Sequence, residues 1–296
     1  MLTLLYHNIL TGPADDVPVA ERQVTLETFR RHMLRFRHKL LNPFDVHAQL
    51  TVGKVPRGVL VSFDDGAVGV INAGRVLAEL GAVGVVFICP GAIANGLWFH
   101  RVADAIVRAT TQRLRWRQLD QALAGRSARL AAYSSVSKVL FEMSPVARDE
   151  ALEEVVDALH ISSAQPTAAL ATLDEVTLRQ AQATGGLVFA NHSWSHPNLV
   201  ALSTQELDRE VSGAQSWLES SGLPVLPWFA FPRGIHDARV REVVARHCRV
   251  AFGASARETA PQVLPRTYMC QLDASWVRLA VKTAWQGRLR RHLLWK

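Results

Sequence analysis

The sequence predicts a parallel α/β fold. Short apolar segments rich in β-branched and aromatic residues alternate with longer helical stretches, and pairs of polar, metal-ligating residues directly follow two of the apolar segments. This alternation is typical of strands joined by crossover helices into a parallel sheet. The chain has 296 residues, of which 49% are hydrophobic, so it can bury a full core in one large domain.

Six short segments have the composition of buried strands, because each is mostly β-branched or aromatic. They are residues 2–6, 58–63, 83–88, 187–190, 225–231 and 249–252.

Local signals predict where several helices begin and end. A helix over about 68–80 should stop at Gly81, which can take the left-handed conformation of a helix C-terminus. Another should begin at Ser144, with Pro145 in the first helical position. Two further starts carry the spacing of a capping box, Thr172 with Glu175 and Ser203 with Glu206. The stretch from about 95 to 170 is rich in Ala, Leu and Arg and lacks strand signals, so we expect a mainly helical insertion between core strands.

The composition indicates the cellular compartment of the protein and the charge of its partners. Cys89, Cys248 and Cys270 are few and lie in apolar contexts, which favours buried thiols in a reducing compartment over a disulfide. No signal peptide and no apolar run long enough to span a bilayer is present, so we expect a soluble, cytoplasmic protein. The net charge of +7 suits an anionic partner such as a phospholipid surface or an acidic glycan.

Two carboxylates follow the predicted strand 58–63. Asp64 and Asp65 precede Gly66, at the end of a parallel strand where functional side chains collect. An alternative interpretation is an ordinary turn or helix cap, since Asp-Asp-Gly is common turn chemistry.

Two histidines follow the predicted strand 187–190. His192 and His196 are good ligands for zinc and similar metals, and together with one carboxylate they leave a coordination position open, as catalytic sites do. The alternative is a pair of loop histidines bonded to the backbone, which becomes less attractive once the Asp-Asp-Gly segment is considered with it.

These segments resemble the first two motifs of the polysaccharide deacetylases, the family with the NodB homology domain, also called carbohydrate esterase family 4. Phe229-Ala230-Phe231-Pro232-Arg233-Gly234 is similar to the third motif of the exopolysaccharide-modifying branch. Leu5-Tyr6-His7 and Val263-Leu264-Pro265-Arg266 resemble the opening and closing segments of that branch. The resemblance implies a distorted (β/α)7-type barrel whose catalytic domain spans residues 1–275, with the helical insertion inside it.

The resemblance also implies roles for individual residues. Asp65, His192 and His196 would bind a divalent metal, most simply zinc, with cobalt, nickel or manganese as alternatives. Asp64 would act as general base toward the attacking water. A divalent ion can lower the pKa of water to about 7 and polarise an amide carbonyl, so a nearby carboxylate suffices at neutral pH. The implied reaction is removal of the acetyl group from an N-acetylated sugar.

The remaining catalytic groups depart from the family pattern. The wider family places an arginine two residues before the third-motif proline, where this chain has Ala230. The resemblance of the closing segment to that of the branch implies that Arg266 orients Asp64 instead. An exposed cation is the alternative for Arg266. No clean match to the late histidine motif exists, and the resemblance to the exopolysaccharide-modifying branch, in which the early Tyr-His supplies the acid, implies that His7 is the general acid. His7 follows the first predicted strand and should lie at the same rim as the metal. The alternative acids are His236, His247 and His292.

Substrate contacts are expected from Trp194, Pro232, Arg233 and Trp228, because they lie in the second and third motifs or just before them. Indole rings stack on the apolar faces of sugars, although most tryptophans belong to a core.

The segment 276–296 is basic and amphipathic. A terminal helix packed on the domain is the first interpretation, and peripheral contact with an anionic membrane at the inner face is the second. The latter would suit a lipid-linked precursor of a cell-surface polysaccharide. Nucleic-acid binding is not expected, since no recognition module is present. An O-deacetylase or another sugar amide hydrolase, and a catalytically silent glycan-binding protein, are the alternative functions.

Overall fold

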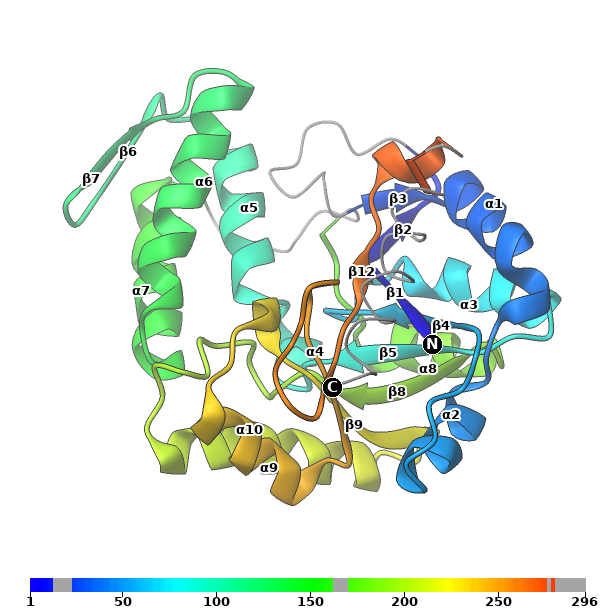
Figure 1. The fold of residues 1–296 in the computed structure, drawn as a ribbon. Helices are drawn as coiled ribbons and strands as arrows, with labels where there is room; N and C mark the ends of the chain where they lie inside the picture. The colour runs from blue at the N-terminus through cyan, green and yellow to red at the C-terminus, as the bar shows by residue number, and fades with distance from the viewer. Residues whose placement is uncertain (13–22, 162–169, 276–277, 280–296) are drawn as a thin grey trace.

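The computed structural model describes residues 1–12, 23–161, 170–275 and 278–279 (Figure 1). Its main sheet has eight strands in these residues, all parallel, in the order β11-β10-β9-β8-β5-β4-β1-β12. The strands are β1 (Leu2–Tyr6), β4 (Val59–Phe63), β5 (Gly84–Ile88), β8 (Leu187–Asn191), β9 (Val225–Ala230), β10 (Val250–Phe252), β11 (Val263–Leu264) and β12 (Thr267–Tyr268). All six predicted strands are therefore confirmed, with ends that shift by one residue at most.

The two shortest strands close the sheet. β11 pairs with β10 at one edge, whereas β12 pairs with β1 at the other edge. Only Pro265 and Arg266 separate them, and three residue steps reach at most about 11 Å. The two edges must therefore approach each other, which curls the sheet into the predicted distorted barrel.

Alternate side chains of the strands enter two different cores, as strand geometry requires. One set packs under the outer helices α1 (Leu26–Phe36), α3 (Val70–Glu79), α8 (Glu175–Ala183), α9 (Thr204–Ser220) and α10 (Ala238–His247). The other set fills the barrel and includes Leu60, Phe87, Val188 and Trp228. Val46 of α2 (Pro43–Thr51) joins this inner cluster. A separate two-stranded sheet joins β2 (Asn8–Leu10) to β3 (Gln23–Thr25).

Most predicted helix signals are confirmed. Gly81 has φ 64° just after α3, and the Ser144 and Ser203 side chains cap α7 (Pro145–Ala158) and α9. The predicted cap at Thr172 is wrong. Asp174 caps α8 instead and forms a capping box with Thr177, because a carboxylate one position before the helix competes better for its free N–H groups.

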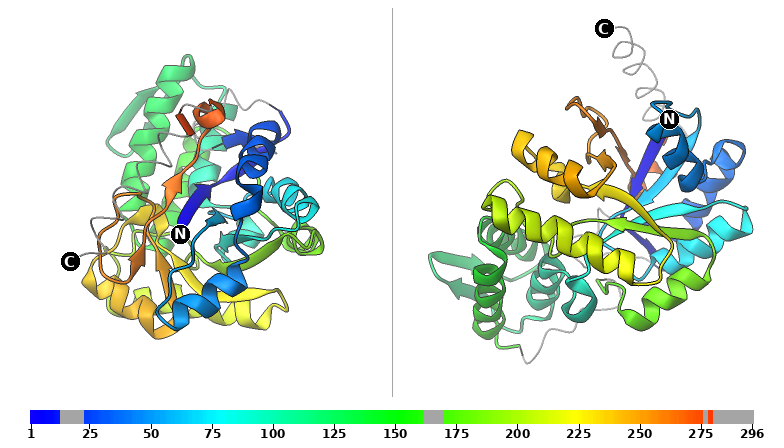
Figure 2. Two further views of the ribbon diagram at one scale, coloured as in Figure 1. Left: turned by 45° about the vertical axis from the view of Figure 1, so that its right-hand side comes forward. Right: turned by 90° about the horizontal axis from the view of Figure 1, so that it is seen from below.

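The segment that follows β5 stands to one side of the barrel (Figures 1 and 2). In the described residues it contains α4 (Ala92–Asn95), α5 (Trp98–Arg108), α6 (Arg126–Phe141) and α7. These helices share a hydrophobic cluster of their own. The segment also holds an antiparallel pair of strands, β6 (Arg113–Trp116) and β7 (Leu119–Ala122), so the expectation of no strands was wrong there.

The basic amphipathic segment predicted for 276–296 lies outside the described residues, apart from Arg278 and Leu279. Among the helices that the structure describes, none combines the length and the apolar character needed to cross a bilayer.

Candidate active site

Asp64 and Asp65 leave the carboxyl end of β4 in different directions. The Asp64 backbone N–H donates to the Tyr6 carbonyl at 3.0 Å, which continues the pairing of β4 with β1. Asp65 then takes φ 72°, a left-handed conformation that turns the chain before Gly66. This reversal aims the two neighbouring carboxylates at different partners, and both are buried.

Asp65 converges with His192 and His196, although Asp65 comes from the first quarter of the sequence and the two histidines come from the third. Asp65 Oδ1 lies 3.4 Å from His192 Nε2 and 3.5 Å from His196 Nε2. One ligand atom from each of the three residues lies within 4.8 Å of the others, and all three side chains are buried.

This arrangement fits a divalent metal. Ligand bonds of about 2.1 Å at tetrahedral angles place donor atoms about 3.4 Å apart, close to the spacings found here. Asp65 Oδ1 is buried and accepts no well-formed hydrogen bond from the described residues. His192 Nδ1 donates to the Ala230 carbonyl at 2.8 Å, which leaves Nε2, 3.4 Å from Asp65 Oδ1, as the ring atom that can bind a metal. The three residues therefore form a candidate metal centre.

The acidic and basic groups of this cluster shift each other's pKa toward the charged forms. Burial would raise the pKa of Asp65, but His192, His7 and His196 outweigh it and hold the pKa well below its usual range. Burial would lower the pKa of His192, but Asp64 and Asp65 outweigh it, so the pKa of His192 is raised. A cation is thus favoured at this position, whether a proton or a metal ion.

Asp64 forms a bidentate ion pair with Arg266. Arg266 Nη1 lies 2.6 Å from Oδ1, and Nη2 lies 2.7 Å from Oδ2. Arg266 is completely buried, donates from Nε to the Gly253 carbonyl at 2.7 Å, and packs over the Phe87 ring. The structure therefore places Arg266 where Asp64 can be oriented, and Arg266 is not an exposed cation.

His7 lies at the same rim as the candidate metal centre. Its Nε2 is 3.9 Å from Asp65 Oδ2, and its ring meets Tyr268 edge-on. The alternative histidines contact acidic side chains instead: His236 Nε2 is 3.2 Å from Glu258, and His247 Nε2 is 2.9 Å from Asp208. His292 lies outside the described residues.

The four residues expected to contact substrate have different surroundings. Trp194, which lies between the two motif histidines in the chain, is 38% exposed. The exposed Arg233 places its guanidinium 4.1 Å from the centre of the Phe141 ring. Pro232 is buried at the start of a short 3-10 turn. The prediction for Trp228 is wrong, because Trp228 is completely buried in the inner core and donates to His47 Nδ1 at 3.0 Å.

Three residues that the sequence analysis missed hold the loop between the two histidines. They are Glu210 of α9, Arg148 of α7 and Trp98 of α5, which bond to Ser195 or His196. Glu210 carried a signal in the sequence, because it occupies the buried face of α9 together with Leu207, Val211 and Ala214. An acidic residue in such a position needs a polar partner.

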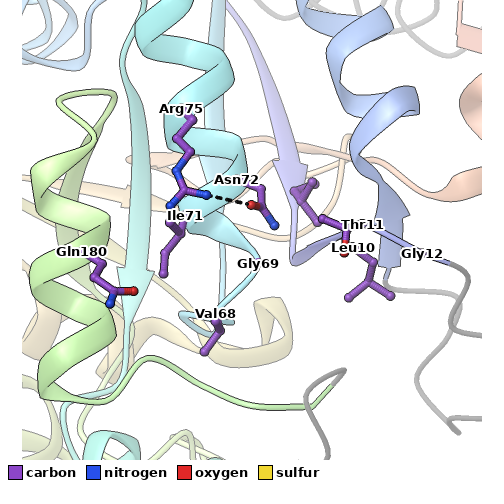
Figure 3. Close-up of a pocket in the computed structure, with 10 residues that line it drawn as sticks. Leu10, Thr11, Gly12, Val68, Gly69, Ile71, Asn72, Arg75 and Gln180 are labelled. Carbon is purple, nitrogen blue, oxygen red and sulfur yellow. Dashed lines mark hydrogen bonds between the residues drawn. The ribbon is translucent and has the colours of Figure 1, made fainter.

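A separate pocket of about 370 Å³ lies between β2, α3 and α8 (Figure 3). Asn72 accepts a hydrogen bond from Arg75 at its wall. None of the residues expected in the active site lines it; the lining residues are Ile9, Leu10, Thr11, Gly12, Val68, Gly69, Ile71, Asn72, Arg75 and Gln180.

Comparison with known proteins agrees with this geometry. The sequence pattern of the polysaccharide deacetylase family matches residues 136–249, which include the histidine motif and the third motif but not Asp64 and Asp65. No curated protein sequence matches the chain.

Several solved deacetylase structures share the fold. The Streptococcus pyogenes deacetylase PplD, solved with acetate, is 15% identical, with 91% of this chain and 92% of that chain covered and a TM-score of 0.57. IcaB from Ammonifex degensii is 14% identical, with 96% of both chains covered and a TM-score of 0.56. A de-N-acetylase from Aggregatibacter actinomycetemcomitans is 9% identical, with 95% of this chain and 98% of that chain covered and a TM-score of 0.57. The resemblance seen in the motifs is confirmed: the chain has the barrel fold of the polysaccharide deacetylases and, over residues 136–249, the sequence pattern of that family.

Proposed function

We propose that the protein is a metal-dependent hydrolase that removes the acetyl group from an N-acetylated sugar and releases acetate. The observation that carries this proposal is the convergence of Asp65, His192 and His196 beside an Asp64 carboxylate that Arg266 holds in place. The catalytic unit would comprise residues 1–275, including the insertion.

Asp65, His192 and His196 would hold the metal, with zinc as the first candidate because two imidazoles and one carboxylate match its preferences. When bound, the ion would polarise the amide carbonyl and acidify the attacking water. His192 is held in the required tautomer by its Nδ1 contact to Ala230.

The chain's own groups would move the protons. Asp64 would take the proton of the attacking water, and Arg266 would keep that carboxylate from turning away. A backbone N–H near Arg233 would stabilise the oxyanion. His7, at the same rim, would protonate the leaving amine. Breaking the amide bond then yields acetate and a free amine on the sugar.

The substrate we propose is an N-acetylated residue of a cell-surface polysaccharide or of its lipid-linked precursor. Trp194, between the two motif histidines in the sequence, has a partly exposed ring that would stack on a sugar. One relative in fold is described as a de-N-acetylase, which supports an N-acetyl amide as the bond that is cleaved. Action at the inner membrane face stays a prediction from the sequence.

The test is a matched assay of N-acetylated and O-acetylated oligosaccharides with purified protein before and after chelation. We expect stoichiometric metal, release of acetate with a free amine, and loss of both products after chelation with recovery on adding zinc or cobalt. Acetate without free amine would make the protein an O-deacetylase. Glycan binding without acetate release, in protein that has its metal, would make it a silent binding module.

A further inference from the structure

Ser195, between the two motif histidines, is held by a buried carboxylate. Glu210 Oε2 accepts the Ser195 backbone N–H at 2.8 Å, and Oε1 accepts the Ser195 hydroxyl at 2.7 Å. The backbone carbonyl of Glu210 also accepts the Trp194 N–H at 2.9 Å. Helix α9 thus binds the histidine loop at two successive residues.

Side chains of the insertion bind the backbone carbonyl groups of the same loop. Arg148 of α7, also buried, donates from Nη1 to the Ser195 carbonyl at 3.1 Å. Trp98 of α5 donates from Nε1 to the His196 carbonyl at 3.0 Å, and the Arg148 guanidinium lies over the Trp98 ring. Ser195 is therefore bound by a buried anion on its N–H side and a buried cation on its C=O side.

The loop needs this support because its backbone is strained. Ser193 has φ 67° and His196 has φ 56°, a region that residues with a side chain rarely adopt. Such conformations persist only where the surroundings over-determine them. The hydrogen bond from His196 N–H to Ser193 Oγ closes the loop on itself, but the contacts from Glu210, Arg148 and Trp98 fix it to the protein.

We propose that Glu210 and Arg148 are positioning residues that set His196 Nε2 in the metal centre, so that the insertion completes this centre. The proposal rests on the metal site of the proposed function. Burying two charges is costly, and in the described residues Glu210 and Arg148 do not form an ion pair with each other. Arg148 also pairs with Asp149 at 3.0 Å. Both Glu210 and Arg148 bind Ser195, which is the arrangement expected if their role is to fix this loop.

The test compares four variants in the full chain. Glu210→Leu removes the side-chain contacts to the Ser195 N–H and hydroxyl, and Arg148→Met removes the contact to the Ser195 carbonyl. Glu210→Gln keeps the shape, and its amide can still accept the Ser195 N–H while donating to the hydroxyl. Glu206→Ala is the matched control, because it removes the capping box of the same helix without touching the loop. Metal affinity is measured by chelator competition, and the site geometry by the visible absorption spectrum of the cobalt-loaded protein.

We expect Glu210→Leu and Arg148→Met to weaken metal binding about 10- to 100-fold and to change the cobalt spectrum, as loss of outer support does in other metal sites. Glu210→Gln should restore affinity to within about threefold of the wild type. Glu206→Ala should lower the melting temperature and leave affinity and spectrum unchanged.

Wild-type affinity and spectrum in Glu210→Leu and Arg148→Met would overturn this inference and leave the proposed function standing. An equal loss of affinity in Glu206→Ala would also overturn it, because a general loss of helix stability would then be the cause. If Glu210→Leu does not fold, Ser195→Ala gives the same answer, since it removes only the hydroxyl contact and should change the cobalt spectrum. A wild-type protein that binds no metal would refute the proposed function itself.

Discussion

Arg266 binds both carboxylate oxygens of Asp64, a residue 202 positions earlier in the chain. The two parallel N–H···O bonds match the planar fork of a guanidinium, which a lysine ammonium cannot reproduce. The wider polysaccharide deacetylase family places an arginine at the position occupied here by Ala230. In this protein the Ala230 carbonyl binds His192, and the arginine arrives from the seam between β11 and β12.

Arg266→Lys should slow turnover about 10- to 100-fold while leaving the metal bound, because a single point donor no longer fixes both oxygens of the base. Steady-state kinetics and metal analysis check this, with Arg246→Lys on the exposed face of α10 as control. Arg266→Ala should in addition cost about 3–5 kcal/mol of unfolding free energy, since it leaves a buried carboxylate unpaired. Unchanged turnover in Arg266→Lys would remove the positioning role.

Asp64→Asn should reduce turnover by about 10²- to 10⁴-fold, the usual contribution of a general base, while metal stoichiometry stays at the wild-type value. Acetate release and metal content are measured on the same preparation. A variant that keeps near-native turnover would show that Asp64 is not the base.

His192→Ala should lose metal and turnover together, because only two protein ligands remain. The exposed His38→Ala is the control and should behave as wild type. Metal retained at full stoichiometry in His192→Ala would contradict the assignment of the centre.

Metal affinity should rise with pH across the neutral range. The pKa of His192 is raised in the metal-free protein, so at a pH below this raised pKa a proton occupies the imidazole and competes with the metal. The metal-free fold gains stability from this protonated imidazole below the ordinary histidine pKa, and loses it as pH rises through the raised pKa. Calorimetry in buffers of different ionisation enthalpy should detect proton release on binding near neutral pH. An affinity independent of pH between about 6 and 8 would contradict this.

Substitutions of Trp194 and Trp228 should affect different properties, the first substrate binding and the second stability. Trp194→Ala should raise KM with little effect on stability, because the ring is 38% exposed. Trp228→Phe should leave KM unchanged and cost about 1–3 kcal/mol of stability, since it removes buried volume and the hydrogen bond to His47. Denaturant unfolding and substrate titration distinguish the two, and a raised KM in Trp228→Phe would show that Trp228 contacts the substrate after all.

The candidate metal centre was predictable because its three residues follow strands that periodicity identifies. Asp65 and His192 lie just past β4 and β8, and parallel strands bring their carboxyl ends to one rim. The position of Arg266 was harder to predict from the sequence. It lies between two strands of only two residues each, which are too short to show an alternation of apolar and polar residues. Its expected role came from the resemblance of Val263-Leu264-Pro265-Arg266.

The wrong predictions concern features that a local sequence pattern does not determine, such as how deep a side chain lies in the barrel and which residue caps a helix. Trp228 and Ala230 point to the same side of β9. Because Trp228 is two residues nearer the start of the strand, it lies about 6.6 Å further from the rim, in the inner hydrophobic cluster of the barrel. Thr172 with Glu175 and Asp174 with Thr177 have the same spacing, and only the observed start of α8 distinguishes them. The β6–β7 hairpin was hidden because arginines occupy its exposed positions.

The position of Arg266 at the barrel seam ties the ion pair of Asp64 to synthesis of the segment that joins β11 to β12. A ribosome must synthesise the chain as far as Arg266 before Asp64 acquires its counter-charge. A nascent or truncated product that stops before Pro265 would contain an open sheet edge and an isolated anion in its interior, both of which disfavour a compact state. Chains that stop before this segment are thus disfavoured from forming the compact site around Asp64.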